Sequence, residues 1–370
     1  MLMIPAWPKS LPSALTVAEA DICARCAGRK CPHGHQLRQN ERVPTFIDEY
    51  GVPIVYYAWP VDNPRAIVQL VHGVGEHARR YREVARALNA AGYSVYADDH
   101  RGHGQTGMLQ HGGDAARLGR LGVGGLRAAV AAVHTFTGVI RQAALQQAAV
   151  HGAQPVPSVQ SAQPAGSALS TPSTLSGQSA LPAPAVPLVL LGHSWGSFMA
   201  QMILNEYPQD YQAVVLTGTA YRWPGYLDSG DLNRKHKHLG TTGAEWLSRD
   251  PAVAAAFVAD PLTTSVPLAA LFGLRDAARI LGRPARRLPA TLPVFIQVGG
   301  DDPVGGERSA RKLVTAYTRR SGLRDVSLIV YPGARHEVFN ETNRAEVLAD
   351  LVAWLNARLP APAQESAADD

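Results

Sequence analysis

Residues 186–206, VPLVLLGHSWGSFMAQMILNE, decide the fold of this chain. The branched apolar run at its start is typical of a buried strand, and the residues after Gly196 have the apolar spacing of a helix. Glycines on both sides of a serine let the backbone turn sharply between strand and helix, which exposes the hydroxyl above the sheet. The segment therefore predicts a nucleophile elbow centred on Ser194, against the alternative of a glycine-rich packing turn with an inert serine.

Short strands and amphipathic helices alternate on both sides of this elbow. Such alternation is typical of βαβ units, so we predict an α/β fold with a mostly parallel central sheet and helices on both faces. Catalytic groups of such folds collect at the carboxyl ends of the strands. The predicted strands are two short ones within 45–60, then 66–73, 93–100, 186–191, 212–218, 292–300 and 326–331, and the main predicted helices cover 79–92, 123–142, 197–207, 307–320 and 344–359.

Composition restricts the class of protein. The chain has 370 residues, of which 46% are hydrophobic, 18% charged and 7% aromatic, which excludes wholesale disorder, collagen-like repeats and a coiled coil. The net charge of +5 comes mostly from scattered arginines rather than a basic stripe with interleaved aromatics, so we expect no nucleic-acid partner. No apolar run of about 18 residues is present, and the proline-interrupted start is a poor secretory signal, so we expect a cytoplasmic protein.

Two low-complexity regions are expected to lie outside the folded core. Residues 1–43 are predicted to form a flexible extension, and residues 143–186, rich in Ala, Gln, Ser and Pro, a disordered insert. Cys23, Cys26 and Cys31 in the extension have the short spacing of half a metal site. Because no second ligand pair accompanies them, we predict that they bind no metal.

A serine nucleophile needs a base, and the base needs an orienting acid. Of thirteen histidines, only His336 lies just beyond the final predicted strand, so chain order selects it as the base. The acid is expected from the pair Asp301 and Asp302, which follows the strand at 292–300. We predict Asp302, because a residue before a proline is held extended, with Asp301 as the alternative.

The developing oxyanion needs hydrogen-bond donors. We predict the backbone N–H of Val74, in the turn after the strand at 66–73, and that of Trp195, directly after the nucleophile. Whether His72 and Glu76, in the same turn, do more than form hydrogen bonds there stays open.

Five motifs in a fixed order carry a family resemblance: HGVGEHARRY (72–81), DDHRGHGQTG (98–107), LLGHSWGS (190–197), GGDDPVGG (299–306) and YPGARHEVFNE (331–341). From about residue 45 to 358 the chain resembles the bacterial lysophospholipase and monoacylglycerol-lipase-like α/β-hydrolases, which are related to serine aminopeptidases. The resemblance implies an α/β-hydrolase core at 44–218 and 291–360 and a helical cap at 219–290, while the polar composition of residues 361–370 predicts a mobile tail. It also implies Ser194, Asp302 and His336 as triad, Val74 and Trp195 as oxyanion donors, and no cofactor.

Residues 219–290, called the cap segment below, contain apolar side chains at helical spacing. Leu271 and Phe272 fit either ordinary helix packing or an acyl-binding lid, and Tyr221 and Trp223 either line an acyl pocket or pack in the core. We expect transient contact of this segment with a membrane surface. The oligomeric state stays open.

The expected function is hydrolysis of carboxylic esters of single-chain lipids, monoacylglycerols or lysophospholipids, through an acyl-enzyme. An aminopeptidase or other small-ester or amide hydrolase is the alternative, and it would need acidic cap residues for a free amine, with Glu245, Asp250 and Asp260 as candidates. A non-catalytic binding module is disfavoured by the complete Ser, Asp and His set. A serine at the elbow excludes haloalkane dehalogenases and epoxide hydrolases, which need an aspartate there.

Overall fold

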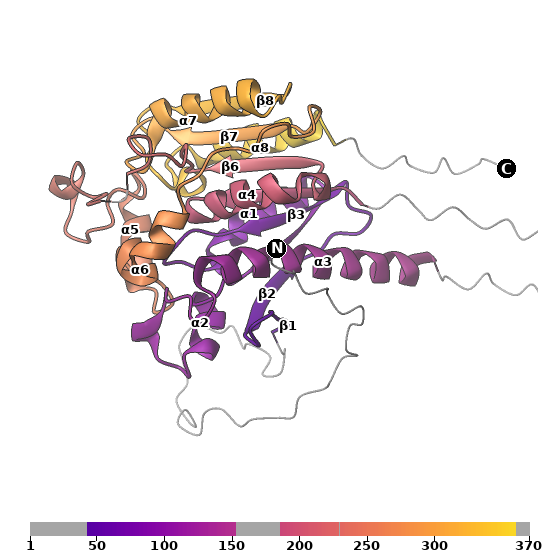
Figure 1. Ribbon diagram of the computed structural model, residues 1–370, viewed down its shortest axis with the longest axis horizontal. Helices are drawn as coiled ribbons and strands as arrows, with labels where there is room; N and C mark the ends of the chain where they lie inside the picture. The colour runs from indigo at the N-terminus through magenta and orange to yellow at the C-terminus, as the bar shows by residue number, and fades with distance from the viewer. Residues whose placement is uncertain (1–42, 153–185, 229, 360–370) are drawn as a thin grey trace, which may run out of the picture. The chain divides into compact units, whose positions relative to one another are not determined.

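The computed structural model describes residues 43–152, 186–228 and 230–359. These residues form a sheet in the order β1-β2-β4-β3-β5-β6-β7-β8 (Figure 1), in which β2 is antiparallel to both of its neighbours and every pair from β4 to β8 is parallel. The predicted mostly parallel sheet is thereby confirmed. The strands are β1 (Thr45–Ile47), β2 (Pro53–Trp59), β3 (Ala66–Val71), β4 (Tyr93–Asp98), β5 (Leu188–His193), β6 (Ala213–Thr217), β7 (Val294–Gly299) and β8 (Val326–Tyr331).

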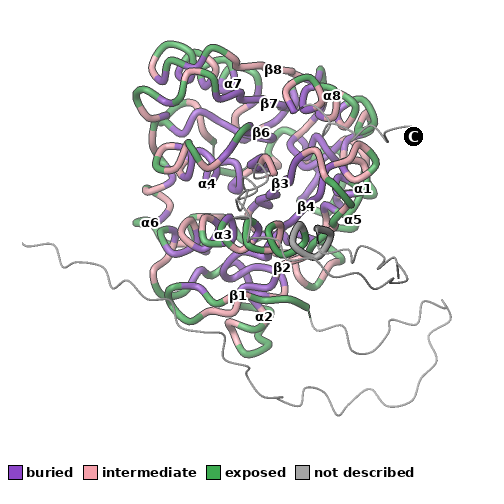
Figure 2. Tube along the Cα trace, turned by 90° about the vertical axis from the view of Figure 1, so that its right-hand side faces the viewer, coloured by how far each residue is buried: buried purple, intermediate pink, exposed green. Residues whose placement is uncertain are grey.

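Helices cover both faces of this sheet, which explains why the central strands are apolar throughout. Every residue of β3 to β7 is buried, as Figure 2 shows for the middle of the fold. One hydrophobic core contains residues of α3, α4 and α7, and the other contains residues of α1 and α8. The helices are α1 (Arg82–Ala90), α2 (Gly104–Gln110), α3 (Gly125–Gly152), α4 (Trp195–Glu206), α5 (Pro251–Ala259), α6 (Leu268–Arg279), α7 (Gly306–Thr315) and α8 (Arg344–Asn356).

Two helices differ from the expectation. Helix α3 ends at Gly152 rather than Gln142, so residues 143–152, assigned above to a disordered insert, are helical. Their sequence AALQQAAVHG consists largely of strong helix formers, a signal that the low-complexity reading of the region overlooked. Helix α2 was not among the main predicted helices, because Gly104 and Gly107 lower the helix propensity of its short sequence. The rest of the predicted insert, residues 153–185, lies outside the described residues, as do residues 1–42 and the tail.

The attachment points of residues 153–185 lie at the amino ends of the parallel strands. Helix α3 runs antiparallel to β4 and β5 on its way back across the sheet, and β5 begins at Leu188. In Figure 1 the end of α3 is on the right, whereas α5 and α6 lie together on the left. Whatever connects α3 to β5 therefore starts and ends at the edge of the sheet opposite the carboxyl ends.

The cap segment joins β6 to β7 and contains α5 and α6. Helix α6 is kinked at Gly273, whose φ of 76° and ψ of 162° are not helical. The half of α6 after the kink is tied to the core, because a carboxylate oxygen of Asp276 accepts the N–H of Leu126 at 3.0 Å. Among the described helices none is both long enough and apolar enough to cross a bilayer, and the expected cytoplasmic location stays a prediction.

Candidate active site

Ser194 lies in the sharp turn between β5 and α4. Its φ of 53° and ψ of −126° are a backbone conformation that side-chain-bearing residues rarely adopt. The two flanking glycines make this turn possible. A Cβ at Gly196 would overlap the carbonyl oxygens of Val71 and His72, and one at Gly192 would lie 2.7 Å from the carbonyl oxygen of Gly196. Backbone packing therefore requires glycine on both sides of Ser194. The strained backbone conformation of Ser194 is the one that exposes its hydroxyl.

His336 and Asp302 meet at the carboxyl end of the sheet. Nδ1 of His336 lies 2.9 Å from Oδ1 of Asp302, and this carboxylate oxygen also accepts the N–H of Val304 at 2.9 Å. Asp301, the alternative acid, points elsewhere: its carboxylate lies 2.7 Å from Nε2 of His236 and its side chain is half exposed. Asp302 is thus the aspartate that contacts His336.

The other ring nitrogen of His336 is free to act as a base. Nε2 is buried and has no hydrogen-bond partner among the described residues. Burial lowers the pKa of His336, but the charge and hydrogen bond of Asp302, with smaller contributions from Glu337 and Glu76, outweigh burial and raise this pKa above its ordinary value. A neutral imidazole with its proton on Nδ1 directs the Nε2 lone pair away from Asp302.

The two predicted oxyanion donors lie beside Ser194. The hydrogen bonds of the described residues engage neither the N–H of Val74 nor that of Trp195. The turn that carries Val74 is held by two neighbours, since Gly73 donates its N–H to Glu76 at 2.6 Å and the carbonyl of Gly75 accepts the N–H of Thr264 at 2.9 Å. Both free N–H groups are therefore available to an oxygen atom bound next to Ser194.

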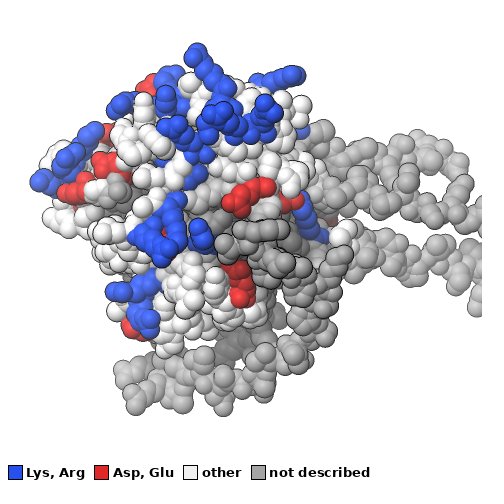
Figure 3. Space-filling model, viewed as in Figure 1, with Lys and Arg blue, Asp and Glu red and all other residues white. Residues whose placement is uncertain are grey.

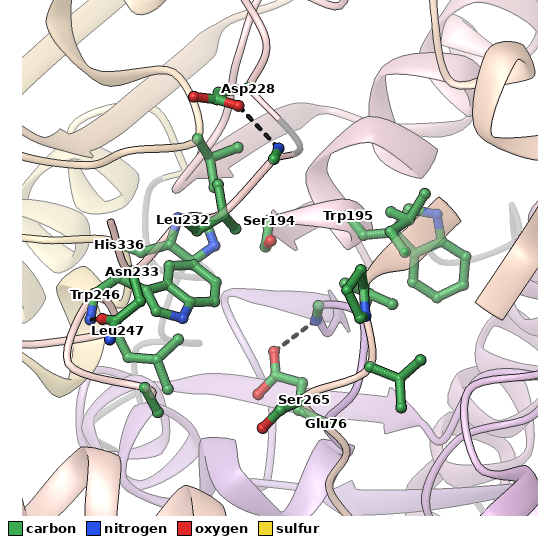
Figure 4. A pocket seen from close by; sticks show the side chains of 18 of the residues that line it. Glu76, Ser194, Trp195, Asp228, Leu232, Asn233, Trp246, Leu247, Ser265 and His336 are labelled. Atoms are coloured by element: carbon green, nitrogen blue, oxygen red, sulfur yellow. Dashed lines mark hydrogen bonds between the residues drawn. The ribbon is translucent and has the colours of Figure 1, made fainter. Parts of the chain in front are cut away.

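A cavity of about 720 Å³ opens onto these groups, a size typical of small-molecule sites. Figure 4 shows Ser194 between His336 on one side and Trp195 on the other. Most of the lining is apolar and comes from α4 and the cap segment. The apolar lining side chains include Val74, Phe198, Leu227, Leu232, Trp246, Leu247, Phe257, Val266, Leu268, Ile280, Leu281 and Val304.

The charged groups that line this cavity are all acidic. Glu76, Glu337, Asp228 and Asp231 take part in the lining, whereas no Lys or Arg does so in the part of the chain that the structure describes. Asp228 accepts the N–H of Gly230 at 2.9 Å, and Asp231 accepts that of Asn233 at 3.1 Å. The cavity is therefore mainly apolar, and its acidic side chains are not gathered at one end, since Asp228 and Glu76 lie on opposite sides of Ser194 in Figure 4.

The four cap side chains expected at the acyl site do not line the cavity. Tyr221 is buried and packs edge-on against Tyr226, and Trp223 lies under the guanidinium of Arg283, 3.8 Å from its ring centre. Leu271 packs against Gly119 in the core. Phe272 touches the indole of Trp195, with ring centres 5.0 Å apart, and so lies behind the cavity wall.

The acidic candidates for an amine site are likewise engaged elsewhere. Glu245 accepts hydrogen bonds from Thr242 and Asn233, Asp250 caps α5, and Asp260 lies 2.9 Å from Nε2 of His77. None of the three lines the cavity. Within the described residues no cluster of three or more His, Cys, Asp or Glu is arranged to hold a metal, and the three cysteines lie outside them.

The sequence reasoning missed Arg80 and Glu337. Glu337 is adjacent to His336 and lines the cavity, and Arg80 binds it from the turn after β3. Glu337 could have been suspected from its position next to the base. Its partner could not, because 257 residues separate the two in the chain.

Comparison with known proteins identifies a family and relatives that cover most of the chain. The family model described as serine aminopeptidase, S33, matches residues 62–158 and 173–343. A monoacylglycerol lipase of Mycolicibacterium smegmatis is 33% identical over 330 residues, covering 85% of this chain and 97% of the relative. The human monoglyceride lipase is 25% identical over 332 residues, covering 85% and 91%. A carboxyl esterase of Bacillus coagulans, solved with glycerol, has the same fold, with a TM-score of 0.66, 23% identity and coverage of 85% and 98%.

Proposed function

Because this chain belongs to the serine aminopeptidase (S33) family of α/β-hydrolases, we propose that it cleaves carboxylic esters of single-chain lipids by way of an acyl-enzyme. The observation that carries the proposal is the strained elbow at Ser194, whose side chain lines the same apolar cavity as His336, with His336 bonded to Asp302. The names of two relatives that cover most of the chain, a monoacylglycerol lipase and a monoglyceride lipase, support the same substrate class.

The reaction follows from the roles of these groups. Oγ of Ser194 attacks the ester carbonyl carbon as Nε2 of His336 takes its proton, and Asp302 stabilises the resulting imidazolium. The N–H groups of Val74 and Trp195 donate to the carbonyl oxygen as it becomes negative. His336 then gives the proton to the leaving alcohol, and the ester bond to the alcohol breaks. Water attacks the acyl-enzyme by the same route, which releases the fatty acid and restores Ser194.

The charge of the cavity favours a neutral head group. A phosphate next to the leaving oxygen would face Glu76 and Glu337, whose two negative charges Arg80 offsets only in part, and no Lys or Arg of the described residues lines the cavity itself. A monoacylglycerol carries only hydroxyls at this position, and carboxylates accept hydrogen bonds from hydroxyls. We therefore propose monoacylglycerols as substrates in preference to anionic lysophospholipids.

The cap segment is proposed to touch the lipid surface that holds the substrate. Leu274 is 84% exposed at the kink of α6, and Val266 and Leu281, which line the cavity, are also exposed on their outer side. Helix α6 also carries Arg275 and Arg279, and Lys and Arg side chains are prominent in the view of Figure 3, mainly in its upper part. Exposed apolar side chains on a helix that also carries arginines suit transient contact with a bilayer.

One experiment tests the proposal. The wild-type protein and the Ser194→Ala variant are assayed with monooleoylglycerol, oleoyl lysophosphatidylglycerol and proline naphthylamide. We expect turnover of monooleoylglycerol to exceed that of the other two and to fall by several orders of magnitude in the variant. Equal ester turnover by both proteins would refute the catalytic assignment, and faster cleavage of the naphthylamide would favour the aminopeptidase.

A further inference from the structure

Arg80 bridges two loops that carry different parts of the active site. It belongs to the short helix η1 (Ala78–Tyr81), which follows the turn of Val74. One guanidinium nitrogen of Arg80 lies 2.5 Å from a carboxylate oxygen of Glu76 and 2.7 Å from Oε1 of Glu337, and the other lies 2.8 Å from Oε2 of Glu337. All three side chains are largely buried.

Each carboxylate is in turn bonded to the backbone or to a side chain of its own loop. The second oxygen of Glu76 accepts the N–H of Gly73 at 2.6 Å and the hydroxyl of Tyr81 at 2.7 Å, directly before the oxyanion donor Val74. Glu337 follows His336, and its carboxylate also accepts the side-chain amide of Asn340 at 2.8 Å. Arg80 thus links the oxyanion turn to the loop of the base.

We propose that Arg80 is a positioning residue that holds the Val74 turn and the His336 loop at a fixed separation, and that the Glu76–Arg80–Glu337 cluster provides a net negative charge that favours the imidazolium form of His336 during proton transfer. The inference rests on the proposed function, because it assigns a role relative to Ser194 and His336. It concerns no group that touches the reacting atoms.

Charged and titratable groups face His336 from several elements. Asp302 approaches from the loop after β7, His193 from the end of β5 and Glu76 from the loop after β3, and Glu337 follows His336 in the chain. The cap segment contributes the uncharged ring of Trp246, with its centre 4.9 Å from that of His336. Burial, together with nearby His336, lowers the pKa of His193 to about 3, so His193 is neutral in the working pH range. Two carboxylates sharing one guanidinium therefore leave one negative charge beyond that of Asp302.

The guanidinium of Arg80 also reduces the effect of the Glu76 carboxylate charge on the oxyanion site. Glu76 lies beside the N–H groups that would bind the oxyanion, and an uncompensated carboxylate there would oppose negative charge on the substrate. Arg80 offsets that repulsion, and its bidentate contact with Glu337 fixes the geometry. Its guanidinium lies 5.0 Å from the ring centre of Phe257, so the cap segment packs against the same residue.

Two substitutions that remove charges of opposite sign distinguish an electrostatic and positioning role of the cluster from a general loss of structure, because only the former shifts the pH profile in opposite directions. Arg80→Gln leaves two unpaired carboxylates, so we expect the acid limb of the kcat/KM profile to move to higher pH. Glu337→Gln, which is nearly isosteric, removes a negative charge, so we expect that limb to move to lower pH. Each shift should be roughly half to one pH unit. Arg80→Gln should also lower kcat about 10²-fold with a smaller change in KM, and Arg80→Lys should return the limb to its wild-type position.

The assay uses the full chain with p-nitrophenyl butyrate at the isosbestic wavelength of p-nitrophenol, and a second readout follows fluorophosphonate labelling of Ser194 against pH. Arg358→Gln is the matched control, because it removes a bidentate pair with Asp325 at the amino ends of the strands. It should lower the melting temperature and leave the pH profile unchanged.

The outcomes separate two failures. If wild type and Ser194→Ala hydrolyse the ester equally, the proposed function fails. If only wild type is active and the acid limbs of Arg80→Gln and Glu337→Gln coincide with that of wild type in both readouts, the role of the cluster is refuted. Opposite shifts of the two limbs support it.

Discussion

His336 and Asp302 are joined by a 2.9 Å contact between Nδ1 and Oδ1, whereas Asp301, the residue directly before Asp302, contacts His236 instead. Asp302→Asn should therefore lower kcat by about 10⁴-fold, because the amide favours the wrong tautomer of His336. Asp301→Asn is the matched control and should leave kcat near the wild-type value. Comparison of the two rates on one soluble ester tests the assignment, and a larger loss in Asp301→Asn would reverse it.

The close packing around the elbow glycines predicts that a single added methyl group strongly reduces both activity and stability. Gly196→Ala should abolish activity and lower the free energy of unfolding by about 1–3 kcal/mol or more, because the new Cβ overlaps the backbone oxygens of Val71 and His72 at the end of β3. Gly138→Ala is the control: nothing lies within 4 Å of a Cβ there, inside α3, and the change should stabilise by up to about 1 kcal/mol. Denaturant unfolding of both variants checks this, and equal stabilities would contradict the packing argument.

Acid should destabilise the fold through its buried histidines. Burial lowers the pKa of His103 and of His193 to about 3, below the value near 6.5 of the unfolded chain. The unfolded state then binds more protons, so the stability that these residues contribute is complete above pH 6.5 and is lost as the pH falls towards 3. For the two together the loss should reach about 4 kcal/mol at pH 5. His336 acts in the opposite direction, because its raised pKa favours the folded state below pH 6.5.

Melting temperatures at pH 7.5 and pH 5.0 measure this loss. In His103→Asn, which keeps a donor for the carbonyl of Arg101, the difference between the two temperatures should shrink. His238→Asn changes an exposed histidine and should behave like wild type. A wild-type protein that melts at the same temperature at both pH values would disprove the prediction.

The length of acyl chain accepted should depend on Leu232, which lines the cavity near Ser194 and His336 (Figure 4). Leu232→Trp fills part of the cavity, so the rate on monooleoylglycerol should fall much more than that on monobutyrin. Trp223→Ala alters a side chain outside the lining and should preserve the wild-type ratio of the two rates. If Trp223→Ala changes the ratio and Leu232→Trp does not, the acyl site lies elsewhere.

Contact with lipid should depend on Leu274. Leu274→Asp places a charge on the exposed kink of α6, so activity on monooleoylglycerol in anionic vesicles should fall while activity on p-nitrophenyl butyrate persists. Leu145→Asp changes another exposed leucine, on α3, and should affect neither substrate. Vesicle sedimentation gives an independent measure, and equal binding by all three proteins would exclude this contact.

The order of strands and motifs in the sequence was enough to predict that Ser194, Asp302 and His336 lie at one edge of the sheet. Each follows a strand of strong apolar pattern, and parallel strands present their carboxyl ends together. The cap segment was less predictable. Helical spacing shows that Phe272 is on an apolar face, but whether that face meets the cavity or the back of Trp195 depends on the kink at Gly273 and on tertiary contacts. Arg80 and Glu337 are far apart in the chain and meet only in the folded structure, so no local sequence pattern predicts their ion pair.

The place where residues 153–185 enter and leave the folded domain has a practical consequence. Helix α3 ends and β5 begins at the amino ends of the strands, opposite the active site. A change in the length or composition of the segment between them should therefore leave the positions of Ser194, Asp302 and His336 unchanged. The same junction is a suitable insertion site for protein engineering. A fluorescent reporter or an immobilisation tag inserted there would lie at the edge of the sheet opposite the active-site cavity.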